Sequence, residues 1–342
     1  MTLTHMAAEI RETPDAVARL LDREGGALVA AGRRLAALGP PVVITCARGS
    51  SDNAAAYFKY LCEILVGVPV SSIGPSVASL YRAPLRLKGA AVVAVSQSGQ
   101  SPDIVALQAA AKAAGAFSVA VVNDAASPLA AGADAVVPLH AGPERSVAAT
   151  KSCLASAVAL AALVAAWAGD DALAAAVRRL PDALRAATQA DWARAVPALE
   201  RAGSAYTVGR GPALPIAAEA ALKLKETAML HAEAFSGAEV MHGPLQLLQP
   251  GFPVIAFRQD DASMGAMAGA AARLRAAGGQ VFEVATASPG ATDWLPAAPT
   301  GHPALDPLGM LLSFYGFAEQ VARVRGHDPD HPSQLRKVTE TL

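Results

Sequence analysis

The chain of 342 residues is poor in aromatic side chains and carries almost no net charge. Aromatic residues make up 5% of it, and the formal net charge is −1. Proteins that bind nucleic acid usually show a basic surplus together with stacking aromatics. We therefore expect no nucleic-acid partner, although a few local hydrogen-bond donors could still hold a small anion.

Cysteine is also scarce, because the chain has only Cys46, Cys62 and Cys153. Three thiols at long separations do not form a disulfide framework, and such usage suits a reducing compartment. We therefore expect a cytoplasmic protein. No CxxC pair, HExxH motif or close group of histidines and cysteines predicts a metal site. The N-terminus has no basic region followed by an apolar core, so it does not resemble a secretory signal.

Long hydrophobic runs are scarce, although hydrophobic residues make up 53% of the chain. The longest extends from Cys153 to Ala168, is rich in alanine and contains Ser156. It falls short of the ~20 apolar residues that a membrane span needs. We interpret it as a buried helix and expect no membrane partner.

Short apolar runs alternate with helical spacing in the first half of the chain. The spacing within 6–38 predicts one or two helices, and the expected strands lie at 41–46, 68–70, 91–95, 118–122 and 135–139. Strands that alternate with helices indicate a parallel, doubly wound sheet.

The second half repeats this plan at a constant offset, the one that relates Thr45 to Thr207. The same offset relates several other positions: Arg48 to Arg210, Gly49 to Gly211, 93–95 to 255–257, Gln97 to Gln259, and Val119 to Val281. A constant shift across three strands suggests gene duplication.

We therefore predict an α/β fold of two tandem doubly wound parallel-sheet domains, flavodoxin-like in topology, plus a C-terminal tail. The expected parts are a helical lead at 1–38, a first domain at 39–170, a second domain at 190–326 and the tail at 327–342. The polar, helical region at 170–202 would link the two domains.

A turn rich in serine, Ser96–Ser101, follows one buried strand and precedes a helix that Pro102 would begin. Ser101 can cap that helix, whose free amides and dipole attract anions. Taken alone, the turn could equally be an ordinary polar cap. A second hydroxyl-rich turn, Gly49–Ser51, follows the first strand, and ligands of open α/β sheets bind at the carboxyl ends of strands. The two turns could converge on one anion.

Nucleotide binding through a known loop is not expected. Gly209-Arg210-Gly211 lacks the third glycine of a dinucleotide fingerprint, since Leu214 stands at that position, and no GxxxxGK[ST] motif is present.

Lys223 and Glu226 lie three residues apart and would share one face of a helix in the second half. Such a pair is commonly a surface ion pair of little energetic worth. The surrounding alanine and leucine instead suggest a buried helix, and a buried glutamate suits proton abstraction beside a carbonyl. His242 lies in a turn further on, and Lys337 lies near the end of the chain, where a lysine is usually solvated.

Together these segments resemble the SIS (sugar isomerase) family, in particular the isomerase half of glucosamine-6-phosphate synthase and the SIS-type glucosamine-6-phosphate deaminases. The resemblance covers nearly the whole chain. The matching segments, in order, are 49–51, 96–99, 141–144, 147–151, 209–211, 221–226, 231–233, 242–244 and 335–339.

The resemblance implies a role for each matching residue. Those that would bind the sugar phosphate are Ser51, Ser96, Gln97, Ser98 and Ser101, with Val147 and Ala149 beside the sugar. Ala149 replaces a serine, Ser101 a threonine and Ser333 an arginine that the family often has.

The chemistry would fall to four residues of the second half. Glu226 would shuttle a proton between the first two sugar carbons, with Lys223 assisting. His242 would open the ring, reaching the site from the neighbouring protomer of a homodimer, and Lys337 would form an imine with the open-chain ketose. No metal or organic cofactor is implied.

The chain shows only a short helical lead where the synthase has a glutaminase domain, so the resemblance favours deamination of glucosamine 6-phosphate to fructose 6-phosphate and ammonia. The alternatives are a glutamine-independent, isomerizing aminotransferase and a deglycase of ketosamine 6-phosphates. A non-catalytic phosphosugar sensor is disfavoured, because no basic recognition helix precedes the first strand.

Overall fold

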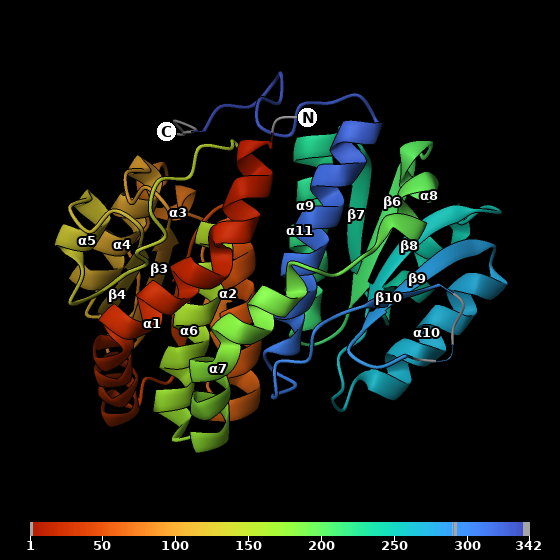
Figure 1. The fold of residues 1–342 in the computed structure, drawn as a ribbon. Coiled ribbons are helices and arrows are strands. Elements are labelled where there is room, and N and C mark those ends of the chain that lie inside the picture. The colour runs from red at the N-terminus through yellow and green to blue at the C-terminus, as the bar shows by residue number, and fades with distance from the viewer. Residues whose placement is uncertain (1–2, 289, 291–292, 338–342) are drawn as a thin grey trace. The chain divides into compact units, whose positions relative to one another are not determined.

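The computed structural model describes residues 3–288, 290 and 293–337. Two five-stranded parallel sheets, each flanked by helices, form its framework (Figure 1). The strands of the first sheet are β1 Val43–Cys46, β2 Val70–Ser72, β3 Ala91–Ser96, β4 Phe117–Val122 and β5 Ala135–Pro138. Those of the second are β6 Ser204–Gly209, β7 His231–Ser236, β8 Phe252–Phe257, β9 Gly279–Ala285 and β10 Trp294–Pro296.

The α-helices of the first half are α1 His5–Leu38, α2 Ser50–Leu61, α3 Ser76–Ser79, α4 Pro102–Ala113, α5 Pro128–Gly132 and α6 Lys151–Ala168. Those of the second half are α7 Asp171–Ala187, α8 Val196–Glu200, α9 Ala213–Ala228, α10 Met264–Ala276 and α11 Asp306–Val324. Short 3₁₀ turns occupy Ala193–Ala195, Glu239–Met241 and Gly243–Leu247, and a π turn, Cys62–Val66, extends α2.

Both sheets follow the same path. The first has the strand order β2-β1-β3-β4-β5, and the second, β7-β6-β8-β9-β10, repeats it with every pair parallel. This confirms the predicted α/β fold of two tandem doubly wound domains, with a topology that is flavodoxin-like.

The internal repeat extends to the strand register. The offset that relates Thr45 to Thr207 also relates their partners: Thr45 pairs with Ser72 and Val93 in the first sheet, and Thr207 pairs with Ala234 and Ile255 in the second. One strand further out the register shifts by one position, because Val93 pairs with Val119 whereas Ile255 pairs with Phe282. Duplication thus explains three adjacent strands of each sheet, β2, β1 and β3 in the first and β7, β6 and β8 in the second.

The lead forms a single helix, α1, which contains Pro14 and agrees with the one or two helices expected there. One strand differs from the expectation. The second strand begins at Val70 rather than 68, because Pro69 has no N–H to donate to the ladder and contributes only its carbonyl, which accepts from Val43 N–H at 3.0 Å.

Alternating side chains of each sheet divide between two apolar layers. In the first sheet one face packs on α4 and α5, through residues such as Ile44, Val92, Ile104 and Leu129. In the second sheet the corresponding face packs on α10, and the opposite face packs on α9 and α11. The predicted buried helix is α6, and among the described residues it is the one helix apolar and long enough to cross a membrane. The fold buries 83% of it, as it would a core helix.

The chain forms two compact units. The first-sheet unit comprises Asp15–Glu144 and Lys151–Arg178. The second-sheet unit comprises 3–14, Arg145–Thr150 and Arg179–Lys337. The short segment Arg145–Thr150 therefore belongs with the second sheet, although it lies in sequence between two parts of the first-sheet unit.

Two glycines of α1 should respond oppositely to alanine. An added Cβ at Gly26 meets nothing within 4 Å, so Gly26→Ala should raise the free energy of unfolding by about 0.5–1 kcal/mol through helix propensity. At Gly32 it would lie 2.5 Å from the Leu163 carbonyl oxygen of α6, and Gly32→Ala should cost about 1–3 kcal/mol. Chemical denaturation of both variants measures the difference, and equal effects would show that α1 does not pack closely on α6.

Candidate functional site

Two polar turns lie together at the carboxyl edge of the first sheet. β1 and β3 are parallel neighbours, so the turns that follow them, Gly49–Ser51 and Ser96–Ser101, leave the sheet at the same edge. From β1 the chain goes to one side of the sheet, and from β3 it goes to the other. This is the topological switch point at which open α/β sheets bind their ligands.

Each of the two turns depends on a glycine. Gly49 has φ 55° and ψ −132°, a conformation essentially restricted to glycine. Gly99 has φ 63°, and a Cβ there would lie 2.1 Å from the Ser127 hydroxyl oxygen. A side chain at either position would therefore move the turn away from the sheet edge.

The serine hydroxyls of the second turn retain donors for a ligand. Gly99 N–H donates to Ser96 Oγ at 3.0 Å and Gln100 N–H donates to Ser98 Oγ at 3.3 Å, so each hydroxyl accepts one bond and keeps its own proton. Ser101 precedes α4 and Pro102 begins it, as predicted. The predicted capping bond is absent, however, which leaves the Ser101 hydroxyl for another acceptor.

One buried carboxylate adjoins these donors, and its charge is balanced. Asp103, in the first turn of α4, is 1% exposed and pairs with Arg48 at 2.5 Å. Its second oxygen accepts from Ile104 N–H at 2.8 Å. Burial, with a smaller contribution from Asp103, raises the pKa of the neighbouring Cys46 thiol to about 12. Cys46 is therefore not a nucleophile at neutral pH.

The equivalent edge of the second sheet carries a carboxylate among its donors. The offset between the two halves relates Gln97 to Gln259 and Ser101 to Ser263. Asp261 accepts from Ser263 N–H at 2.8 Å, from Ser263 Oγ at 2.6 Å and from the Gln259 side-chain amide. These donors are the kind that a phosphate would use. In the second sheet, the donors of this turn thus already bind the carboxylate of Asp261. We therefore expect an external anion to bind at the first sheet.

A line of charged side chains runs along α9. Lys223 is fully buried; its Nζ lies 3.4 Å from Glu219 Oε1 and donates to Glu226 Oε2. Glu219 is also fully buried, whereas Glu226 is 22% exposed. The pair is therefore not a surface ion pair, and Glu226 is the member that a substrate could reach.

The sequence analysis did not identify Glu219. The signal was present, because Glu219, Lys223 and Glu226 follow each other at spacings of four and three, which places them on one helical face. Its fully buried position next to an ammonium is a property of the tertiary structure.

Glu226 lines a cavity of about 490 Å³ within the second-sheet unit. The walls come from the end of α9, the start of β7 and the tail, and their side chains are mostly apolar: Leu222, Lys225, Met229, Leu230, His231 and Pro332–Leu335. Met229 ends α9 in a left-handed conformation with φ 47° and is 61% exposed.

The tail lysine makes a specific contact rather than pointing into solvent. Lys337 Nζ donates to the Ser146 carbonyl at 2.7 Å. Ser146 lies in the segment Arg145–Thr150, which also holds Val147 and Ala149, the residues expected beside the sugar. The last two residues of the tail motif, 338–339, lie outside the described residues.

Two carboxylates hold this arrangement. Glu9 of α1 accepts from the backbone N–H groups of Arg145 and Ser146. Asp330 accepts from the first amides of α1, at His5 and Met6, at 2.6 and 2.7 Å. The start of α1, the Arg145–Thr150 segment and the tail are therefore linked within one unit. Neither carboxylate was singled out from the sequence.

His242 lies apart from the Glu226 cavity. It is exposed between the two 3₁₀ turns that follow β7, and it lines a different cavity with Arg273 and small residues of α10. Within its own chain His242 is not placed beside the α9 carboxylates.

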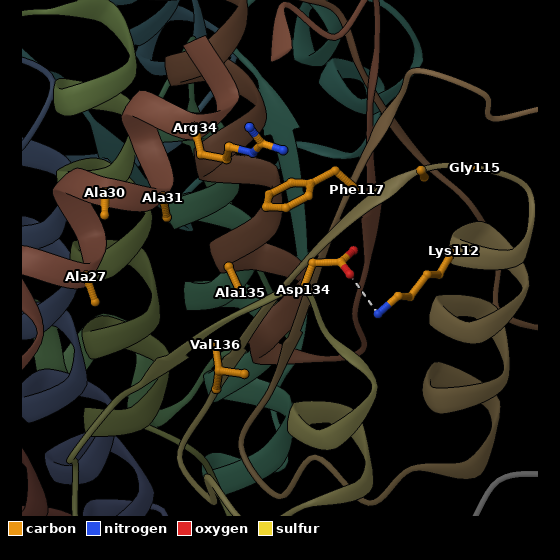
Figure 2. A pocket seen from close by; sticks show the side chains of 11 residues that line it. Ala27, Ala30, Ala31, Arg34, Lys112, Gly115, Phe117, Asp134, Ala135 and Val136 are labelled. Atoms are coloured by element: carbon orange, nitrogen blue, oxygen red, sulfur yellow. Dashed lines mark ion pairs between the residues drawn. The ribbon is translucent and has the colours of Figure 1, made fainter. Parts of the chain in front are cut away.

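A cavity of about 900 Å³ in the first-sheet unit is lined by residues of α1 and of the amino ends of β4 and β5, among them Phe117 and Ala135 (Figure 2). The polar turns leave the sheet at the carboxyl ends of its strands, which is the opposite edge. The charged groups of the cavity already have partners in Lys112–Asp134 at 2.7 Å and in Arg34, which stacks 5.8 Å from the Phe117 ring centre. We do not assign the site to this cavity, because parallel sheets bind ligands at the carboxyl ends of their strands. Within the described part of the chain, no three His, Cys, Asp or Glu side chains group as metal ligands.

Comparisons with known proteins bear on this site. The SIS domain family model matches residues 41–166 and 198–290. Glutamine–fructose-6-phosphate aminotransferase (isomerizing) of Aeropyrum pernix is 34% identical over 97% of this chain, which spans 56% of that relative.

Solved structures agree with this match. A Silicibacter pomeroyi protein, provisionally named a phosphosugar isomerase, is 47% identical with a TM-score of 0.90, covering 96% of this chain and all of that one. The C-terminal domain of the Francisella tularensis glucosamine–fructose-6-phosphate aminotransferase is 25% identical with a TM-score of 0.81, over 96% of this chain and 98% of that domain.

The two equivalent serines provide a matched test of the site. Ser101→Ala, like Ser98→Ala, should weaken binding of inorganic phosphate about tenfold, the loss of one charged hydrogen bond of ~1.4 kcal/mol. Ser263→Ala, whose hydroxyl serves Asp261, should leave the dissociation constant unchanged. Titration calorimetry measures both, and equal weakening by the two variants would contradict an anion site confined to the first sheet.

Proposed function

Since the chain belongs to the SIS domain family, we propose that it interconverts an aldose phosphate and a ketose phosphate by moving a proton between the first two sugar carbons. The observation that carries this proposal is Glu226, a partly exposed carboxylate held by the fully buried ammonium of Lys223. A carboxylate fixed in this way can take a proton from one carbon and return it to the next.

The phosphate is bound at the first sheet, by Ser51, Ser96, Gln97, Ser98 and Ser101. Hydroxyl groups, a side-chain amide and helix amides suit a phosphate dianion without a lysine. This contact lies far along the sugar from the reacting carbons. Its binding energy is therefore available to hold the open chain in place during proton transfer.

Opening of the sugar ring is assigned to His242, which acts on a second copy of the chain in a homodimer. The exposure of His242 and its separation from the Glu226 cavity support this assignment. Lys223, which is fully buried, assists by holding the Glu226 carboxylate in place. We place the homodimer in the cytoplasm, where its three buried cysteines, none of them in a disulfide, would stay reduced.

Among reactions of this class we propose deamination of glucosamine 6-phosphate. Transfer of the proton from C2 to C1 converts the open aldose amine into a ketose imine. Lys337 Nζ then adds to C2 and expels ammonia, and water releases fructose 6-phosphate from the lysine imine. The contact of Lys337 with the Ser146 carbonyl, next to Val147, supports this role. Run backwards with free ammonia, the same steps form the amino sugar, as an isomerizing aminotransferase would.

A second candidate is a deglycase that releases a larger amine from a ketosamine 6-phosphate. The apolar cavity beside Glu226 favours it, because Leu222, Met229, Leu230 and Leu335 could contact a substituent on the departing nitrogen. The proton transfer would be the same in both reactions.

Glu226→Gln should lower kcat at least ~10³-fold, because the amide cannot accept the proton, while the dissociation constant for fructose 6-phosphate changes little. Glu200→Gln, on an exposed part of α8, serves as the matched control and should keep full activity. Turnover retained by Glu226→Gln would remove Glu226 from the mechanism.

A substrate panel separates the two candidates. Glucosamine 6-phosphate should release ammonia, detected by a coupled glutamate dehydrogenase assay. If fructosamine 6-phosphate adducts of apolar amines react faster than glucosamine 6-phosphate, the deglycase is the better assignment. Leu335→Ala should then slow only the adducts, because it shortens one wall of the apolar cavity.

A further inference from the structure

A tyrosine from another helix contacts the charged face of α9. Tyr315 lies on α11 and is fully buried. Its hydroxyl donates to Glu219 Oε1 at 3.1 Å. Burial of a polar group without a partner costs free energy, so this phenol must have a specific acceptor, and the acceptor is a carboxylate rather than a backbone carbonyl.

The same oxygen of Glu219 also faces Lys223 Nζ, at 3.4 Å. A continuous polar chain therefore runs from Tyr315 through Glu219 and Lys223 to Glu226. Three of its four members are fully buried, and only Glu226 reaches the cavity at the end of α9. Such a network acts as a unit, because each bond polarises the next in a medium of low dielectric constant.

Two carboxylates of this polar network, Glu219 and Glu226, compete for the ammonium of Lys223. Each negative charge is stabilised to the extent that Lys223 leans toward it, and that stabilisation is large in the protein interior. The phenol supplies a separate donor to Glu219, which reduces the demand of Glu219 on Lys223. The ammonium is then left to stabilise the ionised form of Glu226.

We propose that Tyr315 is a positioning residue that sets the proton affinity of Glu226 through Glu219 and Lys223. It does not contact the sugar. This inference rests on the proposed function, in which Glu226 is the base, and it adds a residue on a different helix to the machinery of proton transfer.

Other charged groups lie near Glu226 or on the same elements. Lys225 and His231 line the same cavity as Glu226. Glu319 of α11 accepts from Thr4 at 2.9 Å, and Arg325, the residue after α11, donates to the Ala228 carbonyl. These hydrogen bonds do not involve Tyr315, so we expect Tyr315→Phe to act on Glu226 through the bond from the phenol to Glu219.

The test compares Tyr315→Phe with Glu219→Gln, because the two should move the same titration in opposite directions. Without the phenol, Glu219 stays ionised beside Lys223 and draws the ammonium away from Glu226, so the acidic limb of kcat/KM should move up by about 0.5–1 pH unit. In Glu219→Gln the ammonium no longer faces a charged Glu219, so the limb should move down by about as much. Both variants should lose about 5–50-fold in kcat with little change in KM.

Ser313→Ala is the matched control. It removes another buried hydroxyl from α11, one that lies within hydrogen-bond distance of the Ala187 and Gly309 carbonyls and does not contact the charged residues of α9. Its pH profile should equal that of the unchanged protein, whatever the effect on melting temperature. An unchanged limb in Tyr315→Phe, or a shift in the same direction as Glu219→Gln, would overturn the proposal.

A direct readout separates this proposal from the proposed function. Carbon-13 NMR of side-chain-labelled glutamate follows the titration of Glu226, assigned by the signal that disappears in Glu226→Gln. A Glu226 titration that moves up in Tyr315→Phe supports the coupling even if no phosphosugar is turned over, in which case only the proposed function fails. A titration that does not move rejects the coupling even in an active enzyme.

Discussion

The ammonium of Lys223 is completely buried in the second-sheet unit, and a buried charge without compensation would cost several kcal/mol. Its surroundings meet this constraint with two carboxylates of the same helix, one on either side, and with a tyrosine from α11 that satisfies the deeper one. Of the two carboxylates, only that of Glu226 lines a cavity. Compensation of a buried charge and presentation of a reactive carboxylate are thus the same structural feature.

The two sheets share one topology, but the polar turns at their carboxyl edges use their hydrogen-bond donors differently. Both switch points place a polar turn before a long helix, and both retain a glutamine and a serine at matching positions. At the first sheet the serine hydroxyls keep their protons for a ligand. At the second, Asp261 takes the donors, so the helix start is already neutralised by the chain itself. The second turn has Arg258, Asp260 and Asp261 where the first has Ser96, Ser98 and Gly99. Its remaining donors bind Asp261, because the same donors can bind a carboxylate or a phosphate.

The tail acquires its place from contacts that are distant in sequence. Lys337 donates to Ser146, and Asp330 caps the first turn of α1, so the end of the chain is tied to its beginning. The Arg145–Thr150 segment, which the resemblance places beside the sugar, is held by Glu9 of the same helix. Two segments without regular structure of their own, Arg145–Thr150 and the tail, are thereby held by hydrogen bonds to backbone amides and carbonyls.

Local patterns determined much of this protein. Apolar runs between helical stretches predicted the strands, the constant offset between the two halves predicted two sheets of one topology, and spacing put Lys223 and Glu226 on one helical face, because periodicity and repetition are properties of neighbouring residues. The tertiary structure alone decided which groups are buried and what they contact. It brought Tyr315 to Glu219 and Lys337 to Ser146, since these pairings depend on how the helices and the tail pack rather than on local spacing.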